Sequence, residues 1–200
     1  MNFRFFKAVF FIVACAISTL AAAHAGVDAQ AHPDFLAGFT HPMFGLDHLA
    51  AMVAVGVWSA LTARRAGREL LWGPLGFANL LLVGAMFGLK GVALPAVEPM
   101  VAASLLVMGL LVVSRLRLPG VGAALVVGVF AIFHGLAHGY ELAHSPSAFQ
   151  TLAGMLTATV LLHAAGLAIG WSLRNANVWL ARAAGAAGTV FGSVLLLQLT

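Results

Sequence analysis

The chain has 200 residues, of which 62% are hydrophobic and only 8% carry a charge. Soluble domains carry about 25% charged residues, so this composition excludes an ordinary soluble domain and indicates a protein embedded in a lipid bilayer. The formal charge of +4 does not indicate nucleic-acid binding, because the basic residues do not gather in one patch with aromatic side chains. The single cysteine, Cys15, excludes a disulfide framework and a thiolate metal site.

The N-terminal 25 residues have the pattern of a signal peptide. Arg4 and Lys7 precede an apolar run over Ala8 to Leu20, and small residues then allow cleavage after Ala23 or after Ala25. We therefore expect residues 1–25 to be a signal peptide and residues 26–200 to form a single transmembrane helical domain.

Two alternatives to a cleaved signal stay open. An uncleaved first helix is one, but an apolar run of roughly 13 to 16 residues is short for the ~20 that a bilayer requires. A lipoprotein signal that ends at Cys15 is the other, and it would leave a very short apolar region.

A polar lead-in follows the signal, from Gly26 to Thr40. It contains His32 and Asp34, which together with His24 could form a flexible arm that captures a metal ion. A solvated linker is the simpler interpretation.

Six apolar runs occupy the rest of the chain, and each is about 17 to 25 residues long, which is enough for a transmembrane helix. We place them at Phe44–Leu61, Leu70–Leu89, Val97–Val113, Val121–His138, Phe149–Leu173 and Ala183–Leu199. Small residues four apart, such as Gly84 and Gly88, indicate close helix packing. The sequence thus predicts an all-α membrane protein, a polytopic bundle of about six transmembrane helices whose consecutive members are antiparallel.

The basic residues predict how this bundle is oriented. Seven arginines fall in or beside the segments that follow the first, third and fifth runs, whereas Lys90 alone follows the second: Arg64, Arg65, Arg68, Arg115, Arg117, Arg174 and Arg182. Cytoplasmic loops are enriched in Lys and Arg, so these three segments are expected in the cytoplasm. A cleaved signal would leave the mature N-terminus outside, which gives the same orientation.

The first cluster of unusual side chains comprises His41, Asp47 and His48 at the entry to the first apolar run. Pro42 suits the first position of a helix, which would put Asp47 and His48 roughly 8 to 9 Å inside the membrane span. An aspartate at such a depth needs a bound cation or a proton to compensate its charge.

The second cluster lies at the end of the fourth run. His134 and His138 are four residues apart and so share one face of a helix, and Glu141 follows three residues later. If the helix continues through Gly139, that face carries two imidazoles and a carboxylate, which are common metal ligands. One isolated membrane histidine more often forms a hydrogen bond between helices, but the two clusters together favour a metal site.

Other candidate ligands are weaker. His163 stands alone near the middle of the fifth run, where it is either a deeper relay ligand or a packing histidine. Met43 and Met52 flank the first cluster and would suit Cu(I), although core filling is the better interpretation.

The two clusters resemble the motifs of the HupE/UreJ family, small membrane proteins regarded as nickel or cobalt permeases. The motif His-x5-Asp-His stands at His41, Asp47 and His48, and the motif Phe-His-Gly-x-Ala-His-Gly-x-Glu runs from Phe133 to Glu141. The resemblance implies uptake of Ni²⁺ or Co²⁺ from the periplasm through a bacterial inner membrane, often in support of hydrogenase or urease maturation. The expected partners are the divalent metal ion and the lipid bilayer, with no tightly bound cofactor and no nucleic acid.

Several alternatives remain at this stage. The same residues could hold Zn²⁺ in an intramembrane hydrolase, although no separate serine or oxyanion arrangement is apparent. Histidines from two helices could instead bind haem in an electron carrier. No phosphate-cradling loop occurs in the sequence, so ATP-driven transport would need a partner protein. The sequence does not decide between nickel and cobalt as the transported ion. The coupling to an energy source and the oligomeric state, monomer or homo-oligomer, also stay open.

Overall fold

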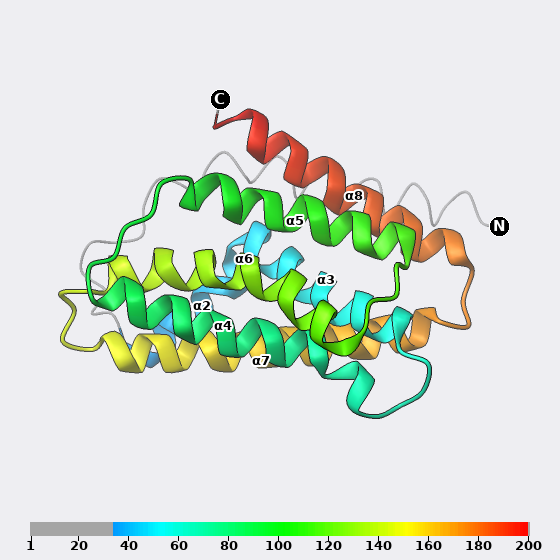
Figure 1. Cartoon of the computed structure of the whole chain (residues 1–200), viewed down its shortest axis with the longest axis horizontal. Coiled ribbons are helices and arrows are strands. Elements are labelled where there is room, and N and C mark those ends of the chain that lie inside the picture. The colour runs from blue at the N-terminus through cyan, green and yellow to red at the C-terminus, as the bar shows by residue number, and fades with distance from the viewer. Residues whose placement is uncertain (1–33, 200) are drawn as a thin grey trace. The chain divides into compact units, whose positions relative to one another are not determined.

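The computed structural model describes residues 34–199, which form seven α-helices and one short 3₁₀ turn (Figure 1). These elements are α2 (Phe35–Phe44), α3 (Leu46–Thr62), η2 (Arg68–Leu70), α4 (Trp72–Leu89), α5 (Val97–Ser114), α6 (Gly120–Glu141), α7 (Ala148–Leu173) and α8 (Val178–Leu197). Within this part of the chain there is no strand.

Five helices, α4 to α8, are each long and apolar enough to cross a membrane, and the bent pair of α2 and α3 could supply a sixth span. The predicted all-α membrane protein with about six spans is therefore confirmed. The predicted signal peptide, together with Cys15, His24 and His32, lies outside the described residues.

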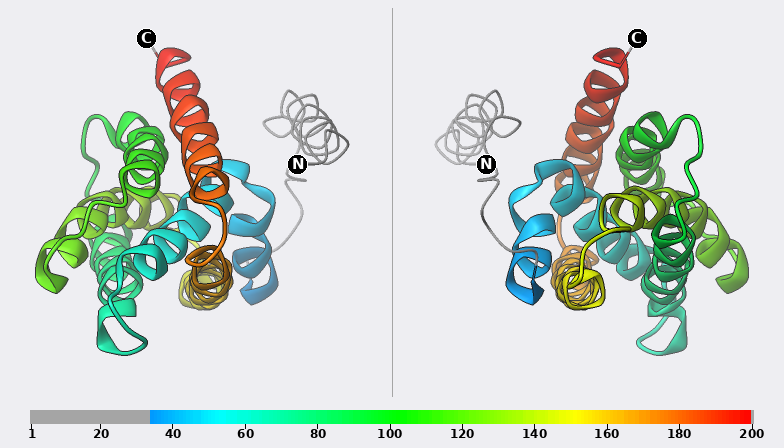
Figure 2. Two further views of the ribbon diagram at one scale, coloured as in Figure 1. Left: turned by 90° about the vertical axis from the view of Figure 1, so that its right-hand side faces the viewer. Right: turned by 90° about the vertical axis from the view of Figure 1, so that its left-hand side faces the viewer.

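The linker prediction was wrong for residues 35–40, which form the first part of helix α2. The carboxylate of Asp34 caps this helix by accepting from the backbone N–H of Ala37 at 2.9 Å. Helix α2 packs beside α7, as Figure 2 shows. The glycines allow this approach, because a methyl group at Gly38 would overlap the backbone of Thr151 and one at Gly154 would overlap that of Phe35.

Helices α2 and α3 meet at an angle of 81°. Pro42 lies inside α2 and has no N–H to donate, and Gly45 adopts an extended backbone between the two helices. The prediction that Pro42 begins the first span is therefore wrong. Because α3 begins at Leu46, Asp47 and His48 lie in its first turn instead of 8 to 9 Å inside a continuous span.

The main helix contacts are α4 with α6, α5 with α8, and α3 with α7. Glycine makes these contacts close. A methyl group at Gly84 would overlap the backbone carbonyl of Ile132, and one at Gly135 would overlap that of Leu81. The packing role predicted for the small residues is confirmed at Gly84.

The loops gather at two opposite ends of the bundle (Figure 1). The segments after α3, α5 and α7 share one end, where Arg174 donates to the backbone carbonyl of Arg64 at 3.3 Å and the Trp58 indole donates to that of Leu116 at 3.0 Å. We call this the arginine end, comprising residues 63–71, 115–119 and 174–177. The segments after α4 and α6, with Lys90 and His144, lie at the opposite end.

Candidate metal centre

Three histidines from three helices meet opposite the arginine end. His41 comes from α2, His48 from α3 and His138 from α6, and one ring nitrogen of each lies within 4.8 Å of the others. The Nε2 atoms of His48 and His138 are 3.1 Å apart. We call these three side chains the histidine trio.

The bend between α2 and α3 assembles one half of the trio. His41 lies in the last turn of α2 and His48 in the first turn of α3, so the change of direction folds one ring back toward the other, with centroids 5.4 Å apart. The last turns of α6 bring His138 to both, at centroid distances of 4.8 Å from His41 and 5.2 Å from His48. His41 is exposed, whereas His138 is buried, so the trio opens to the surface on the side of α2.

Two histidines of the trio, His48 and His138, each have a carboxylate next to the Nδ1 atom. Asp47 Oδ1 lies 3.0 Å from His48 Nδ1, and Glu141 Oε2 lies 3.4 Å from His138 Nδ1. Helix α6 does continue through Gly139, which carries Glu141 to this position. The two predicted acidic residues, Asp47 and Glu141, thus contact the Nδ1 atoms of His48 and His138 and are not part of the trio.

These contacts determine which ring nitrogen carries the proton. A carboxylate only accepts, so the Nδ1–H groups of His48 and His138 donate to Asp47 and Glu141. Each neutral ring then has a bare Nε2, and these two lone pairs face each other across 3.1 Å. Two acceptors at that distance repel one another unless a cation, either a shared proton or a metal ion, lies between them. A histidine with a carboxylate behind it is also the usual arrangement of a metal-bound imidazole.

His134 lies one turn further into the bundle than His138, with a relative exposure of 1%. Its ring is 5.1 Å from that of His48. The hydroxyl of Ser104 donates to the Val101 carbonyl and so accepts from His134 Nε2 at 3.0 Å. His134 Nδ1 is therefore the unprotonated nitrogen, and it has no hydrogen-bond partner among the described residues.

His163 lies apart from the trio, on α7, with a relative exposure of 2%. Its Nε2 also lacks a partner in the described part of the chain. The ring packs edge-on against Phe77, with centroids 5.2 Å apart.

Sequence reasoning missed two residues of this region, Ser104 and Phe77. Ser104 carries the single hydroxyl of the third apolar run, and that isolation was a usable signal. Phe77 is one of 14 phenylalanines, and nothing in the sequence distinguishes it.

Comparisons with known proteins agree with the two motifs. The model of the family described as HupE / UreJ protein matches residues 12–195. The chain is also 41% identical over 189 residues to Protein HupE of Rhizobium leguminosarum bv. viciae, a match that covers 93% of this chain and 95% of that protein. No solved structure matches the chain. The extent of both matches shows that this chain belongs to the HupE/UreJ family of membrane transporters.

Proposed function

We propose that the protein is a permease that moves a divalent transition metal ion, Ni²⁺ in the first place and Co²⁺ as the alternative, from the periplasm to the cytoplasm. The observation that carries the proposal is the pair of Nε2 atoms on His48 and His138, which lie 3.1 Å apart, with a carboxylate next to Nδ1 of each ring. Because the family consists of transporters, we do not propose the intramembrane hydrolase that would use the same residues.

The spacing suits a metal ion bound by neighbouring ligands. Two imidazole nitrogens, each about 2.1 Å from an ion and at right angles to one another, would be about 3.0 Å apart. His41 would supply the third imidazole, since its ligand atom lies within 4.8 Å of both others.

The type of ligand favours late first-row metals. Imidazole suits Zn, Cu, Fe and Ni, whereas Mg²⁺ and Ca²⁺ take oxygen ligands. A given site binds Ni²⁺ more tightly than Co²⁺ and Cu²⁺ more tightly still, so selection against copper must come from geometry or supply.

The surroundings of the trio suit capture followed by release. His41 is exposed and would meet the ion first, whereas His138 is buried and would take it inward. Asp47 and Glu141 would offset the double charge of the ion through the rings of His48 and His138. Transport also requires release, so we expect binding of moderate affinity.

The proposed direction follows from the charge distribution. The seven arginines lie in or next to the arginine end, and the trio lies opposite, so the positive-inside rule puts the trio at the periplasmic face of the inner membrane. Removal of residues 1–25 as a signal peptide would leave the mature N-terminus on that same face.

Uptake of radiolabelled Ni²⁺ and Co²⁺ into proteoliposomes tests this function. The comparison is between the wild type, His48→Ala, His138→Ala and the control His144→Ala. His144 is an exposed histidine in the loop after α6, at the same end of the bundle but outside the trio.

We expect the wild type and His144→Ala to take up metal and both trio variants to lose uptake. The ratio of the Ni²⁺ and Co²⁺ rates would identify the preferred ion. Wild-type vesicles that take up no metal would refute the permease, and full uptake by both trio variants would refute the site.

A further inference from the structure

Phe77 contacts two buried histidines in the interior of the bundle. It projects from α4 with a relative exposure of 2%. Its ring centroid lies 5.7 Å from that of His134 and 5.2 Å from that of His163. One aromatic ring therefore packs against an imidazole of α6 and an imidazole of α7.

Both histidines have an unused ring nitrogen. His134 Nδ1 and His163 Nε2 are buried and without a hydrogen-bond partner among the described residues. Buried polar atoms are almost always paired, so each exception requires an explanation. An unpaired imidazole nitrogen is a ready ligand for a transition metal. Helix packing does not explain two such atoms on rings that both contact Phe77.

Contacts between side chains link the histidine trio to this pair. His134 lies 5.1 Å from His48, ring to ring. Met52 follows His48 by one turn of α3, and its sulfur lies 3.4 Å from the hydroxyl oxygen of Thr159, which donates to the Met155 carbonyl. Thr159 in turn precedes His163 by one turn of α7. Polar and polarisable atoms therefore lead inward from the trio along two touching helices.

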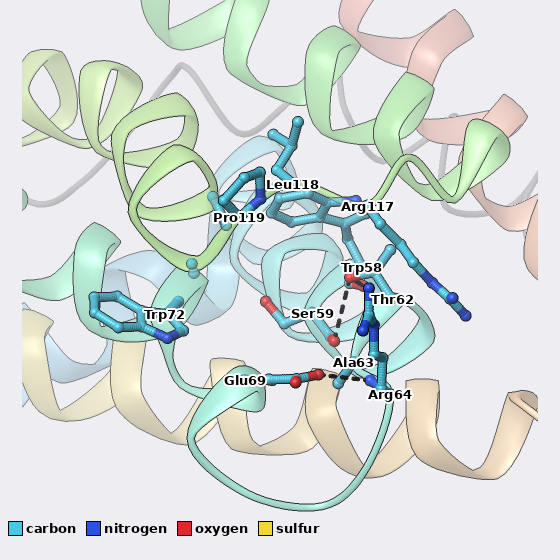
Figure 3. A pocket seen from close by; sticks show the side chains of 13 residues that line it. Trp58, Ser59, Thr62, Ala63, Arg64, Glu69, Trp72, Arg117, Leu118 and Pro119 are labelled. Carbon is cyan, nitrogen blue, oxygen red and sulfur yellow. Dashed lines mark hydrogen bonds between the residues drawn. The ribbon is translucent and has the colours of Figure 1, made fainter.

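Toward the arginine end, helix α4 leads from Phe77 to a buried hydroxyl. Gly73 precedes Phe77 by one turn of α4, and a methyl group there would come within 2.5 Å of Ser59 Oγ. That hydroxyl is buried and has no partner in the described residues. Ser59 lines a cavity of about 470 Å³ at the arginine end, together with Glu69 and Trp72 (Figure 3). At about 30 Å³ for each water, this volume could hold a hydrated ion.

We propose that the metal passes from the trio to His134, then past Phe77 to His163, and leaves through the cavity beside Ser59. This route rests on the proposed function and adds a second coordination step and a gate to it. The Phe77 ring offers no ligand atom, so an ion crosses only when that side chain changes rotamer. The closed ring keeps the two histidines from forming one continuous path, which limits leakage.

The substitution His163→Cys tests whether the metal ion reaches the position of His163. Cys15 is the one cysteine of the sequence, so Cys15→Ser gives a cysteine-free background. In this background, His163→Cys would place a thiolate on the route, and bound Co²⁺ would then show a thiolate charge-transfer absorption. The matched control is Leu162→Cys, at the neighbouring buried position of α7. We expect the absorption in the purified His163→Cys protein and not in the control.

Flux measurements test the roles of both residues. We expect His163→Ala and His163→Gln to lose at least about tenfold in the initial rate of Ni²⁺ uptake, as the loss of a metal-site residue does, while equilibrium binding at the trio is retained. We expect Phe77→Ala and the milder Phe77→Leu to raise the initial rate above that of the wild type. Leu81→Ala, a truncation one turn further along the same face of α4, should leave the rate unchanged.

The outcomes separate this route from the proposed function. Wild-type flux together with full flux in both His163 variants would overturn the route and leave the permease standing. The same holds if Co²⁺ binds the His163→Cys protein without the charge-transfer absorption, or if Phe77→Leu behaves like the wild type. Wild-type vesicles without any uptake would overturn the proposed function, and the route with it.

Discussion

His48 and His138 are 90 positions apart in the sequence, yet their Nε2 atoms lie 3.1 Å apart. One comes from the first turn of α3 and the other from the last turns of α6, so the pair exists only when those helices are assembled. Asp47 and Glu141 contact the Nδ1 atoms of the two rings, and the Nε2 atoms of the rings therefore face each other.

The two carboxylates should contribute unequally to metal binding. We expect Asp47→Ala to weaken Ni²⁺ binding by about 10-fold to 100-fold, because it removes the partner that fixes the His48 tautomer. Glu141→Ala should have a smaller effect, since its contact is longer, 3.4 Å against 3.0 Å, and its side chain is more exposed, 66% against 37%. Calorimetric titration of the purified protein with Ni²⁺ measures both.

Glu98→Ala is the control for this comparison. Glu98 is an exposed carboxylate in the first turn of α5, outside the cluster, and its loss should not change the affinity. An equal loss of affinity in all three variants would indicate a general effect of negative charge, not a specific role of Asp47.

The number and positions of the spans could be predicted from the sequence, because about 20 apolar residues are needed to cross a bilayer and the arginines mark the loops between such runs. The grouping of His134, His138 and Glu141 could also be predicted, since helical spacing alone places them on one face. These features depend on local sequence.

Other features depend on contacts between distant segments and could not be predicted. Helix α2 has only 10 residues, too few for a span, and its fold follows from packing against α7. Hydropathy likewise gives no information on which helices are neighbours. The hydrogen bond between Ser104 and His134 and the position of Phe77 both follow from helix pairing.

Metal uptake should fall as the pH is lowered. A metal ion binds only the neutral imidazole, and the ordinary pKa of histidine is about 6.5, so protons compete with the ion increasingly at lower pH. We expect the initial rate of Ni²⁺ uptake into vesicles to be lower at an external pH of about 5.5 than at about 7.5. An equal rate at both values would argue against imidazole ligands.

The contact between α4 and α6 should tolerate no side chain at Gly135. A methyl group there would overlap the backbone carbonyl of Leu81, so we expect Gly135→Ala to lower the free energy of unfolding by about 1 to 3 kcal/mol. Displacement of α6 would also move His138 away from His48 and weaken metal binding. Thermal unfolding in detergent and Ni²⁺ titration measure the two effects.

Gly122→Ala provides the matched control in the same helix. The nearest atom to its added methyl group would be Pro119 Cδ at 3.6 Å, an ordinary contact. Alanine favours a helix over glycine by up to about 1 kcal/mol, so this variant should be as stable as the wild type or more so. Equal destabilisation of both variants would contradict the close contact at Gly135.

Ser104 should be needed to hold His134 in the orientation that leaves Nδ1 bare. Its hydroxyl accepts from His134 Nε2 at 3.0 Å in a fully buried position. Ser104→Ala would leave that N–H unpaired, at a cost of about 1 to 3 kcal/mol in the free energy of unfolding. It would also allow the proton to move to Nδ1, so we expect slower Ni²⁺ uptake as well. Ser193→Ala, which removes a hydroxyl bonded only within α8, should change neither quantity. A Ser104→Ala protein with wild-type stability and uptake would show that His134 needs no such support.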